Sequence, residues 1–227
     1  MEVRFESNLD EAAVFGVIYN TLKNEFVKTQ DLPVLQLPAT LRKSDPNLIF
    51  QPYYRLESKT NKNILIQVGP KVFSVAITND YTGWEEFLKY INLGLSKLEE
   101  SGVVSKINRM ALRYLNFFDG NVLSKSNLSI TLNDKLFNGF NSQFRIEIPD
   151  GEFIHGLSIN NNVLIEDPTG LKSGSIIDID TFIEKSLLDF FSSKDKLLED
   201  CHDSEKRLFS SLLSDEYVKT LKEVSYE

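Results

Sequence analysis

The chain has 227 residues, of which 41% are hydrophobic and 26% charged, and its formal net charge is −8. This composition is typical of a globular protein, and the acidic balance argues against a dedicated binder of nucleic acid or anionic membranes. The sequence contains no apolar run of about 18 residues, and its single cysteine, Cys201, excludes an internal disulfide. We therefore expect a cytoplasmic protein without a membrane partner.

The first predicted elements are a short strand over Val3–Glu6 and a helix over Leu9–Val27. Asn8 and Glu11 have the spacing of a capping box, in which a polar side chain and a carboxylate close the helix start. The segment Asp31–Pro52 is rich in proline, so an irregular connection is expected there. Apolar residues recur every four positions along the helix and form its core stripe, namely Val14, Ile18, Leu22 and Phe26.

The next stretch is the best-specified part of the chain. Its expected elements are a strand (Ile49–Glu57), a hairpin (Ile64–Val68 and Val72–Ile77, turning at Gly69–Pro70), a helix (Thr82–Glu100) and a long strand (Lys106–Phe118). Thr82 and Glu85 form a second capping-box pattern at the helix start. The order of strands and helices is that of a ferredoxin-like split β-α-β fold with an extra strand.

After Gly120 the pattern changes to short strand candidates separated by turns, which is typical of an antiparallel β-meander. A long final helix is expected to begin near Ser193 or Asp195. The predicted fold class is α+β with antiparallel sheets: a ferredoxin-like half over 1–120, and a meander with a long C-terminal helix over 121–227, as two domains or one continuous domain. The expected meander strands are Leu128–Leu132, Gln143–Ile148, Phe153–Asn160, Asn162–Glu166 and Ser175–Phe182.

Basic residues predict a binding surface on one sheet face. Arg109 and Arg113 lie on the same, solvent-side face of the long strand, and Arg55, Lys71 and Tyr53 come from neighbouring strands. Open sheet faces of ferredoxin-like domains receive RNA when aromatic side chains stack on the bases. The alternative is that these arginines pair with carboxylates of the second sheet, which would leave no basic patch.

Carboxylates near the predicted strands suggest a weaker alternative, a metal site. Asp178 and Asp180 share a strand face, and Glu166 lies near another strand. If the three converged they would bind Mg²⁺ and could support a metal-dependent nuclease. Because 33 acidic residues make such coincidences common, we expect no cofactor.

The histidines and the cysteine do not form a recognisable catalytic group. A zinc site needs several Cys and His ligands, whereas the chain has one cysteine and two histidines. Cys201 and His202 are neighbours on a predicted helix and point in different directions, so Cys201 is expected to be a small core residue. His202 stays a candidate for a local hydrogen bond or a surface role.

Several motifs together resemble a bacterial protein family that is sporadically distributed among genomes and whose function is uncharacterised. The resemblance spans nearly the whole chain, and its central motifs are specific in combination. It implies a role in anti-phage defence or in a toxin–antitoxin-like pair, and it supplies no catalytic residues. The motifs are E-V-R-F at Glu2–Phe5, D-P-N-L at Asp45–Leu48, V-G-P-x-x-F-S at Val68–Ser74, Y-x-G-W-E-x-F at Tyr81–Phe87, L-R-Y-x-N-x-F at Leu112–Phe118, I-I-D-I-D at Ile176–Asp180 and H-x-x-E-K-x-L-F at His202–Phe209.

The sequence therefore favours a non-enzymatic, cytoplasmic protein-binding component of such a system, with a partner encoded nearby. No phosphate-binding glycine loop and no serine-nucleophile motif is present in the sequence. The first alternative is an RNA- or nucleotide-binding protein that uses the arginine-bearing sheet face. A second alternative is a sensor with a small-molecule pocket between the meander and the final helix.

Overall fold

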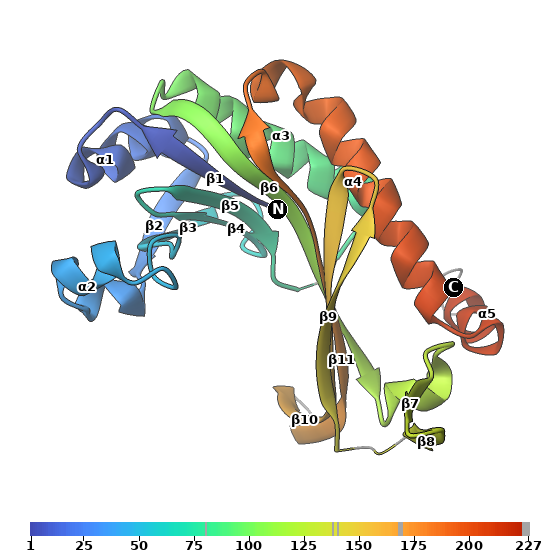
Figure 1. Cartoon of the computed structure of the whole chain (residues 1–227). Coiled ribbons are helices and arrows are strands. Elements are labelled where there is room, and N and C mark those ends of the chain that lie inside the picture. Colours follow the sequence, from blue (N-terminus) through green and yellow to red (C-terminus); the bar gives the residue numbers. More distant parts are fainter. Residues whose placement is uncertain (80, 138, 140, 168–169, 224–227) are drawn as a thin grey trace. The chain divides into compact units, whose positions relative to one another are not determined.

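The computed structural model describes residues 1–79, 81–137, 139, 141–167 and 170–223. The chain divides into two compact units, one of Met1–Ala111 with Glu184–Asp195, the other of Leu112–Ile183 with Lys196–Glu227. β6, β11 and α4 contribute residues to both units (Figure 1). In the part of the chain described, no helix has the length and apolarity needed to cross a membrane.

The first unit contains one antiparallel sheet with the strand order β2-β3-β4-β5-β1-β6. Its elements are β1 (Glu2–Ser7), α1 (Glu11–Leu22), β2 (Phe26–Asp31), η1 (Pro33–Gln36), α2 (Ala39–Ser44), β3 (Tyr54–Ser58), β4 (Ile64–Val68), β5 (Val72–Ile77), α3 (Trp84–Glu100) and β6 (Val104–Asp119). The order β4-β5-β1-β6, with α1 and α3 as connections, is the ferredoxin-like arrangement, and β3 and β2 extend it at one edge. The ferredoxin-like prediction for this half is confirmed.

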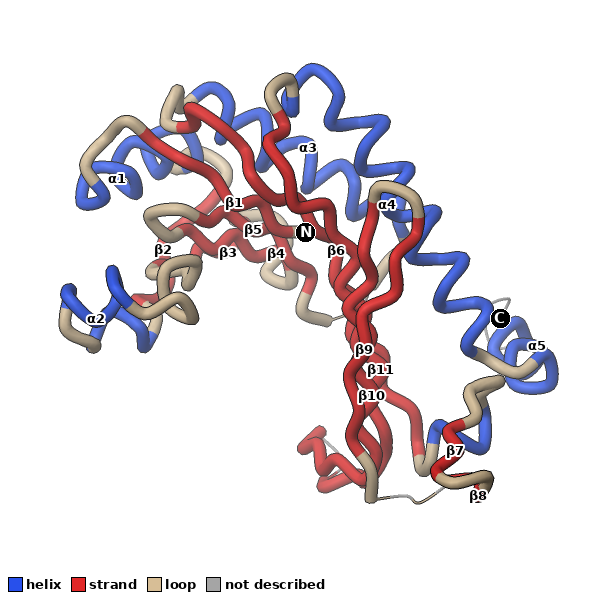
Figure 2. The backbone as a smooth tube through the Cα atoms, in the orientation of Figure 1, coloured by secondary structure: helices blue, strands red, loops and turns tan. Residues whose placement is uncertain are grey.

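Two helices pack side by side in the first unit (Figure 2). α1 buries Val14, Ile18 and Leu22, which confirms most of the predicted stripe. α3 approaches the sheet closely at Gly94, where an added Cβ would lie 2.8 Å from a methyl carbon of Val75. Because Gly94 has no side chain, α3 can lie this close to β5.

Both predicted capping boxes are wrong. α1 begins after Asp10, whose carboxylate accepts a hydrogen bond from the Ala12 amide at 2.9 Å, so Asn8 lies too early to cap the helix. α3 begins after Gly83, which has a φ of 101° and gives no side-chain cap. The left-handed backbone of Gly83 moves the helix start to Trp84 and leaves Thr82 outside it.

The first helix is shorter than predicted, because a turn intervenes after Leu22. The amides of Lys23 and Glu25 donate to the carbonyls of Tyr19 and Leu22, and the chain then enters β2 at Phe26. Phe26 is fully buried, so it continues the four-residue spacing of the helix although it belongs to a strand.

The second unit contains the sheet order β6-β11-β10-β9 and a separate hairpin of β7 and β8. Its further elements are η2 (Val122–Lys125), β7 (Ile130–Leu132), β8 (Lys135–Phe137), β9 (Gln143–Asp150), β10 (Phe153–Asp167), β11 (Gly170–Leu187), α4 (Phe190–Leu212) and α5 (Asp215–Glu223). β9, β10 and β11 pair in sequence order, so the predicted β-meander is confirmed, as is the long C-terminal helix α4.

Two details of the second unit differ from the predictions. The expected turn at residues 160–161 is a β-bulge inside the continuous strand β10, with a register shift between Asn160 and Val163 and a φ of 58° at Asn162. α4 begins at Phe190, before Ser193, whose hydroxyl donates to the Asp189 carbonyl within the first turn. The core of this unit joins Leu157, Ile159, Ile177 and Ile179 to Phe118, Val122, Leu212 and Leu213.

Candidate binding pocket

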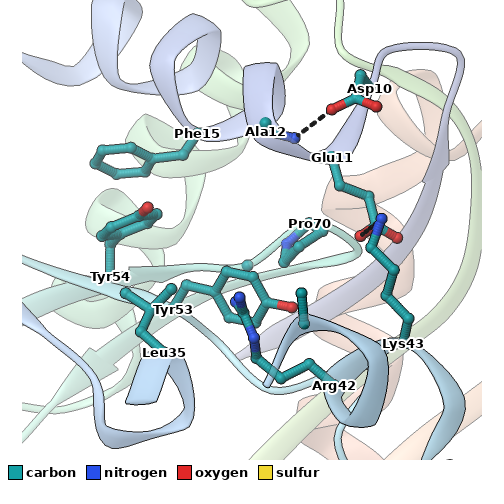
Figure 3. Close-up of a pocket in the computed structure, with 12 residues that line it drawn as sticks. Asp10, Glu11, Ala12, Phe15, Leu35, Arg42, Lys43, Tyr53, Tyr54 and Pro70 are labelled. Atoms are coloured by element: carbon teal, nitrogen blue, oxygen red, sulfur yellow. Dashed lines mark hydrogen bonds and ion pairs between the residues drawn. The ribbon is translucent and has the colours of Figure 1, made fainter. Parts of the chain in front are cut away.

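The first unit holds a cavity of about 280 Å³ between the start of α1, the α2 segment, the start of β3 and the turn after β4 (Figure 3). Gly69 lines the cavity and allows the turn after β4 to lie close to Gln51, because a Cβ at this position would be 2.5 Å from the Gln51 carbonyl oxygen. The prolines of the preceding connection bring α2 and β3 together at the cavity without continuing a regular element. The proline-rich segment is therefore structured, and it forms one side of the pocket.

Aromatic rings form the apolar wall of the pocket. Phe15 stacks on Tyr54 with 3.8 Å between the ring centroids, and the Lys28 ammonium lies 4.7 Å from the Tyr54 centroid on β3. Tyr53 meets Tyr54 edge to face at 6.4 Å. In Figure 3 Phe15 and Tyr54 face each other beside the cavity, and Tyr53 lies below it. Such a wall favours a ligand with an apolar body.

Arg42 is the lining cation of this pocket that forms no ion pair with another described residue. Its guanidinium carbon lies 4.7 Å from the centroid of the Tyr53 ring, a cation–π contact. Its Nε is buried without a hydrogen-bond partner, and no carboxylate among the described residues forms an ion pair with it. A guanidinium has five N–H donors in a planar fork, so Arg42 is prepared to bind a carboxylate or phosphate from outside.

Two carboxylates at the start of α1, Asp10 and Glu11, line the same pocket. Glu11 is already paired, with its two oxygens 3.3 Å from the Lys43 ammonium and 3.9 Å from the Lys71 ammonium. Asp10 caps the Ala12 amide and, within the described part of the chain, forms no ion pair. Among the described residues, the pocket thus combines a cation and a carboxylate that form no ion pairs, namely Arg42 on α2 and Asp10 immediately before α1.

The predicted binding residues are only partly brought together. Tyr53 lines the pocket, and Lys71 reaches its rim through the ion pair with Glu11. Arg55 lies on β3 beside Tyr54, and its Nε is buried without a hydrogen-bond partner. Arg42 and Lys43 lie in the proline-rich segment, for which the sequence predicted an irregular connection and no binding site.

Arg109 does not lie on an open surface, contrary to the solvent-side face predicted for it. It is 5% exposed, and its Nη1 lies 3.1 Å from Oε1 of Glu2, which also accepts a hydrogen bond from Arg4 Nε at 2.9 Å. Two arginines therefore share one carboxylate on the sheet of the first unit. Burial of Arg109 makes it unsuitable for contacts with an RNA backbone.

Arg113 also has a carboxylate partner, in the second unit. Its Nε and Nη2 donate to the two oxygens of Asp178 at 2.8 and 2.6 Å. The predicted alternative had such pairs with carboxylates of a second sheet, but Asp178 lies on β11, the neighbour of β6 in the same sheet. The pair removes Arg113 as an isolated positive charge and occupies Asp178 as well.

The weak alternative of a metal site is not supported by the positions of its carboxylates. Asp178 is held by Arg113, and Asp180 lies opposite Gly156 in the strand register. Glu166 lies opposite Leu171, near the far end of the same pair of strands. Among the described residues no group of three or more His, Cys, Asp and Glu side chains is arranged to hold a metal ion.

His202 and Cys201 lie on α4 and take part in packing. Tyr114 Oη lies 3.4 Å from His202 Nδ1, and burial lowers the pKa of His202. Cys201 is fully buried, its Sγ lies 3.5 Å from the Thr181 carbonyl oxygen, and burial raises its pKa to about 12. Such a thiol stays protonated and is not an activated nucleophile.

A buried hydrogen-bonded chain around His155 was not predicted. Ser204 donates to Asp150 Oδ2 at 2.5 Å, because the carboxylate can only accept. His155 Nε2–H then donates to Ser204 Oγ at 3.2 Å, and its Nδ1 accepts from the Thr181 hydroxyl at 2.8 Å. The Ser204 hydrogen bond, followed by that of Arg207, lowers the pKa of Asp150.

This hydrogen-bonded network resembles a serine–histidine–aspartate triad in composition only. Ser204 is 1% exposed, and its proton points to Asp150 and not to His155, so no base is placed to activate it. Burial lowers the pKa of His155 and keeps the ring neutral. The hydrogen bonds around His155 therefore tie α4 to β9, β10 and β11, which is a structural role.

Comparison with protein-family models, with curated proteins and with solved structures gives no match for this chain. The family resemblance of its motifs stays a prediction, and the function is inferred from the geometry of the pocket.

Proposed function

We propose that the chain is a non-enzymatic, cytoplasmic binding protein whose first unit holds a protein partner by an acidic group inserted into the Arg42 pocket. The observation that carries this proposal is the guanidinium of Arg42, which stacks on Tyr53 and has no carboxylate partner among the described residues. A partner carboxylate would accept hydrogen bonds from its Nη groups and neutralise its charge.

The charges around the pocket favour a protein partner over nucleic acid. Asp10 and Glu11 line the same cavity, and they would repel a chain of phosphates. Arg109 and Arg113, which the RNA-binding alternative requires, are each paired with a carboxylate. A single acidic side chain would bring one negative charge to Arg42, whereas a nucleic acid would bring several phosphates near Asp10 and Glu11.

The biological setting is part of the same proposal. The family resemblance implies a defence-associated or toxin–antitoxin-like system, in which a binding component is made together with its partner. We propose that the partner is the product of an adjacent gene and that it presents an acidic segment to the first unit.

The test is a calorimetric titration of the full chain with the purified product of the adjacent gene. Arg42→Gln should weaken binding by about tenfold or more, because a charge-assisted hydrogen bond contributes about 1.5–3 kcal/mol. Arg42→Lys should give an intermediate affinity, since it keeps the charge and loses the planar fork. Arg145→Gln, which removes an exposed arginine of the second unit, is the matched control.

Equal affinities of the wild type and Arg42→Gln would refute the proposal. A filter-binding assay with single-stranded RNA tests the alternative function, RNA binding. Retention of RNA by the wild type that is lost in the Arg109→Glu/Arg113→Glu variant would favour the RNA-binding alternative, and negligible retention by both proteins would exclude it.

A further inference from the structure

We infer that the group bound in the Arg42 pocket is zwitterionic: a carboxylate that meets Arg42 and a cation that meets Asp10, joined by a short apolar link. This inference rests on the proposed function and specifies the ligand chemistry of the same site. The shared chemistry occurs in a peptide segment with one acidic and one basic residue, and also in a free amino acid.

The first argument is the pairing of charges inside the cavity. Among the described lining residues, Lys43 and Glu11 form an ion pair with each other. Arg42 and Asp10 are the two charged lining residues left without an ion pair there. A ligand with a single negative charge would satisfy Arg42 and would still place that charge in the cavity with Asp10 and Glu11.

The second argument is the position of these two residues. Arg42 comes from α2 and Asp10 from the residue before α1, and Figure 3 shows them on different sides of the cavity. A ligand that satisfies both must therefore cross the cavity. One compact anion, such as a phosphate, can reach Arg42 and cannot offer a cation to Asp10.

The third argument is the surface between the two charges. Leu35, Pro70 and the rings of Tyr53 and Tyr54 line the cavity, so the link between the ligand's charges should be apolar. The cavity volume of about 280 Å³ limits that link to one or two side chains. The geometry thus describes a short, amphipathic and doubly charged group.

The experiment titrates the full ¹⁵N-labelled chain with capped synthetic peptides and follows the amide resonances of the pocket by NMR. The probes are acetyl-Ala-Lys-Leu-Glu-Ala-amide, its longer form with two leucines, and the versions in which Gln replaces Lys, Glu or both. Free 6-aminohexanoate is the small-molecule probe, because a chain of methylene groups separates its two charges. We expect the doubly charged peptide to bind most tightly.

Each charge of the peptide has a matched change in the protein. The peptide Glu→Gln change should weaken binding to the wild type by about tenfold and should have no effect on Arg42→Gln. The peptide Lys→Gln change should weaken binding to the wild type by about two- to fivefold and should have no effect on Asp10→Asn. Asn caps a helix as well as Asp, so Asp10→Asn removes the charge without removing the cap.

The outcomes separate this inference from the proposed function. If the glutamate effect depends on Arg42 while Lys→Gln is silent, the zwitterionic ligand is wrong and binding of a carboxylate stands. If 6-aminohexanoate binds through Arg42 and Asp10 and the peptides do not, the chemistry is supported and the source is a free amino acid. If no probe shifts the pocket resonances, the inference is overturned, and the calorimetric titration with the partner still decides the function.

Discussion

Arg113 holds Asp178 through a two-pronged ion pair, with 2.8 Å from Nε to Oδ1 and 2.6 Å from Nη2 to Oδ2. The pair joins β6 to β11 inside the second unit. It also unites two residues that the sequence assigned to different sites, a basic patch and a weak metal site. Each residue therefore neutralises the charge of the other. The ion pair supports neither RNA binding by Arg113 nor metal binding by Asp178.

The pair should show a measurable coupling in stability. The Arg113 side chain is 57% exposed and that of Asp178 is 17% exposed, so solvent screens the interaction in part. We expect a coupling free energy of about 0.5–1 kcal/mol from the Arg113→Gln/Asp178→Asn double-mutant cycle. Urea unfolding measures it, with Lys135→Gln/Asp178→Asn as the control cycle, because Lys135 is exposed on the separate β7–β8 hairpin. Strictly additive effects would contradict the ion pair.

The order of the elements could be predicted because apolar periodicity and turn residues are local signals. The hairpin at Gly69–Pro70 and the stripe of α1 depend on residues a few positions apart, and the structure has both. The predicted helix starts were wrong because they, too, rested on local patterns. Asp10 and Gly83 set them through backbone dihedral angles that a capping-box pattern does not contain.

The site could not be predicted, since it depends on neighbours in space. Arg113 and Asp178 are 65 positions apart, and nothing local to either shows that β6 lies beside β11. Tyr53 could be selected as an aromatic residue of an expected strand, although it is half-buried and lies just before β3. Arg42 could not, because its missing partner is a property of the folded pocket and not of the sequence around it.

Gly94 should be intolerant of a side chain, although alanine favours helices. A Cβ there would lie 2.8 Å from Val75 Cγ2 and 3.3 Å from the Phe73 ring, so Gly94→Ala must push α3 away from the sheet. We expect a destabilisation of about 1–3 kcal/mol. Gly16→Ala on α1 is the matched control, because nothing lies within 4 Å of its added Cβ. This change should stabilise the fold by about 0.5–1 kcal/mol. Thermal unfolding of both variants gives the comparison, and a stabilised Gly94→Ala would refute the close packing.

Ser204 should matter for stability because it joins the buried ring of His155 to the partly exposed carboxylate of Asp150. Ser204→Ala leaves His155 Nε2–H without its acceptor and removes one donor from Asp150. We expect a loss of about 1–3 kcal/mol of unfolding free energy, the usual effect of an unsatisfied buried group. Ser210→Ala, at an exposed position of the same helix, should change stability by less than about 0.5 kcal/mol. Equal denaturation midpoints for the two variants would show that the hydrogen bonds around His155 do not hold α4 in place.

Glu205 should make the protein less stable as the pH rises from about 4.5 to about 7. It is 5% exposed, and burial raises its pKa from 4.5 to about 7, so the folded state binds its proton more tightly than the unfolded state does. Between these values the unfolded chain loses the proton first, which lowers the free energy of unfolding by up to about 3 kcal/mol. Above pH 7 both states are ionised and the loss is complete.

Glu205→Gln isolates this effect, because glutamine stays neutral at every pH. The lowered pKa values of His155 and His202 act in the opposite direction, since stability falls when the unfolded histidines become protonated below about pH 6.5. Both histidines are present in the variant and in the wild type, so their contribution cancels in the difference. Urea unfolding should give similar stabilities at pH 4 and a more stable variant at pH 8. The exposed Glu199→Gln on the same helix serves as the control. A difference between Glu205→Gln and wild type that does not change with pH would show that the carboxylate of Glu205 is hydrated in the folded protein.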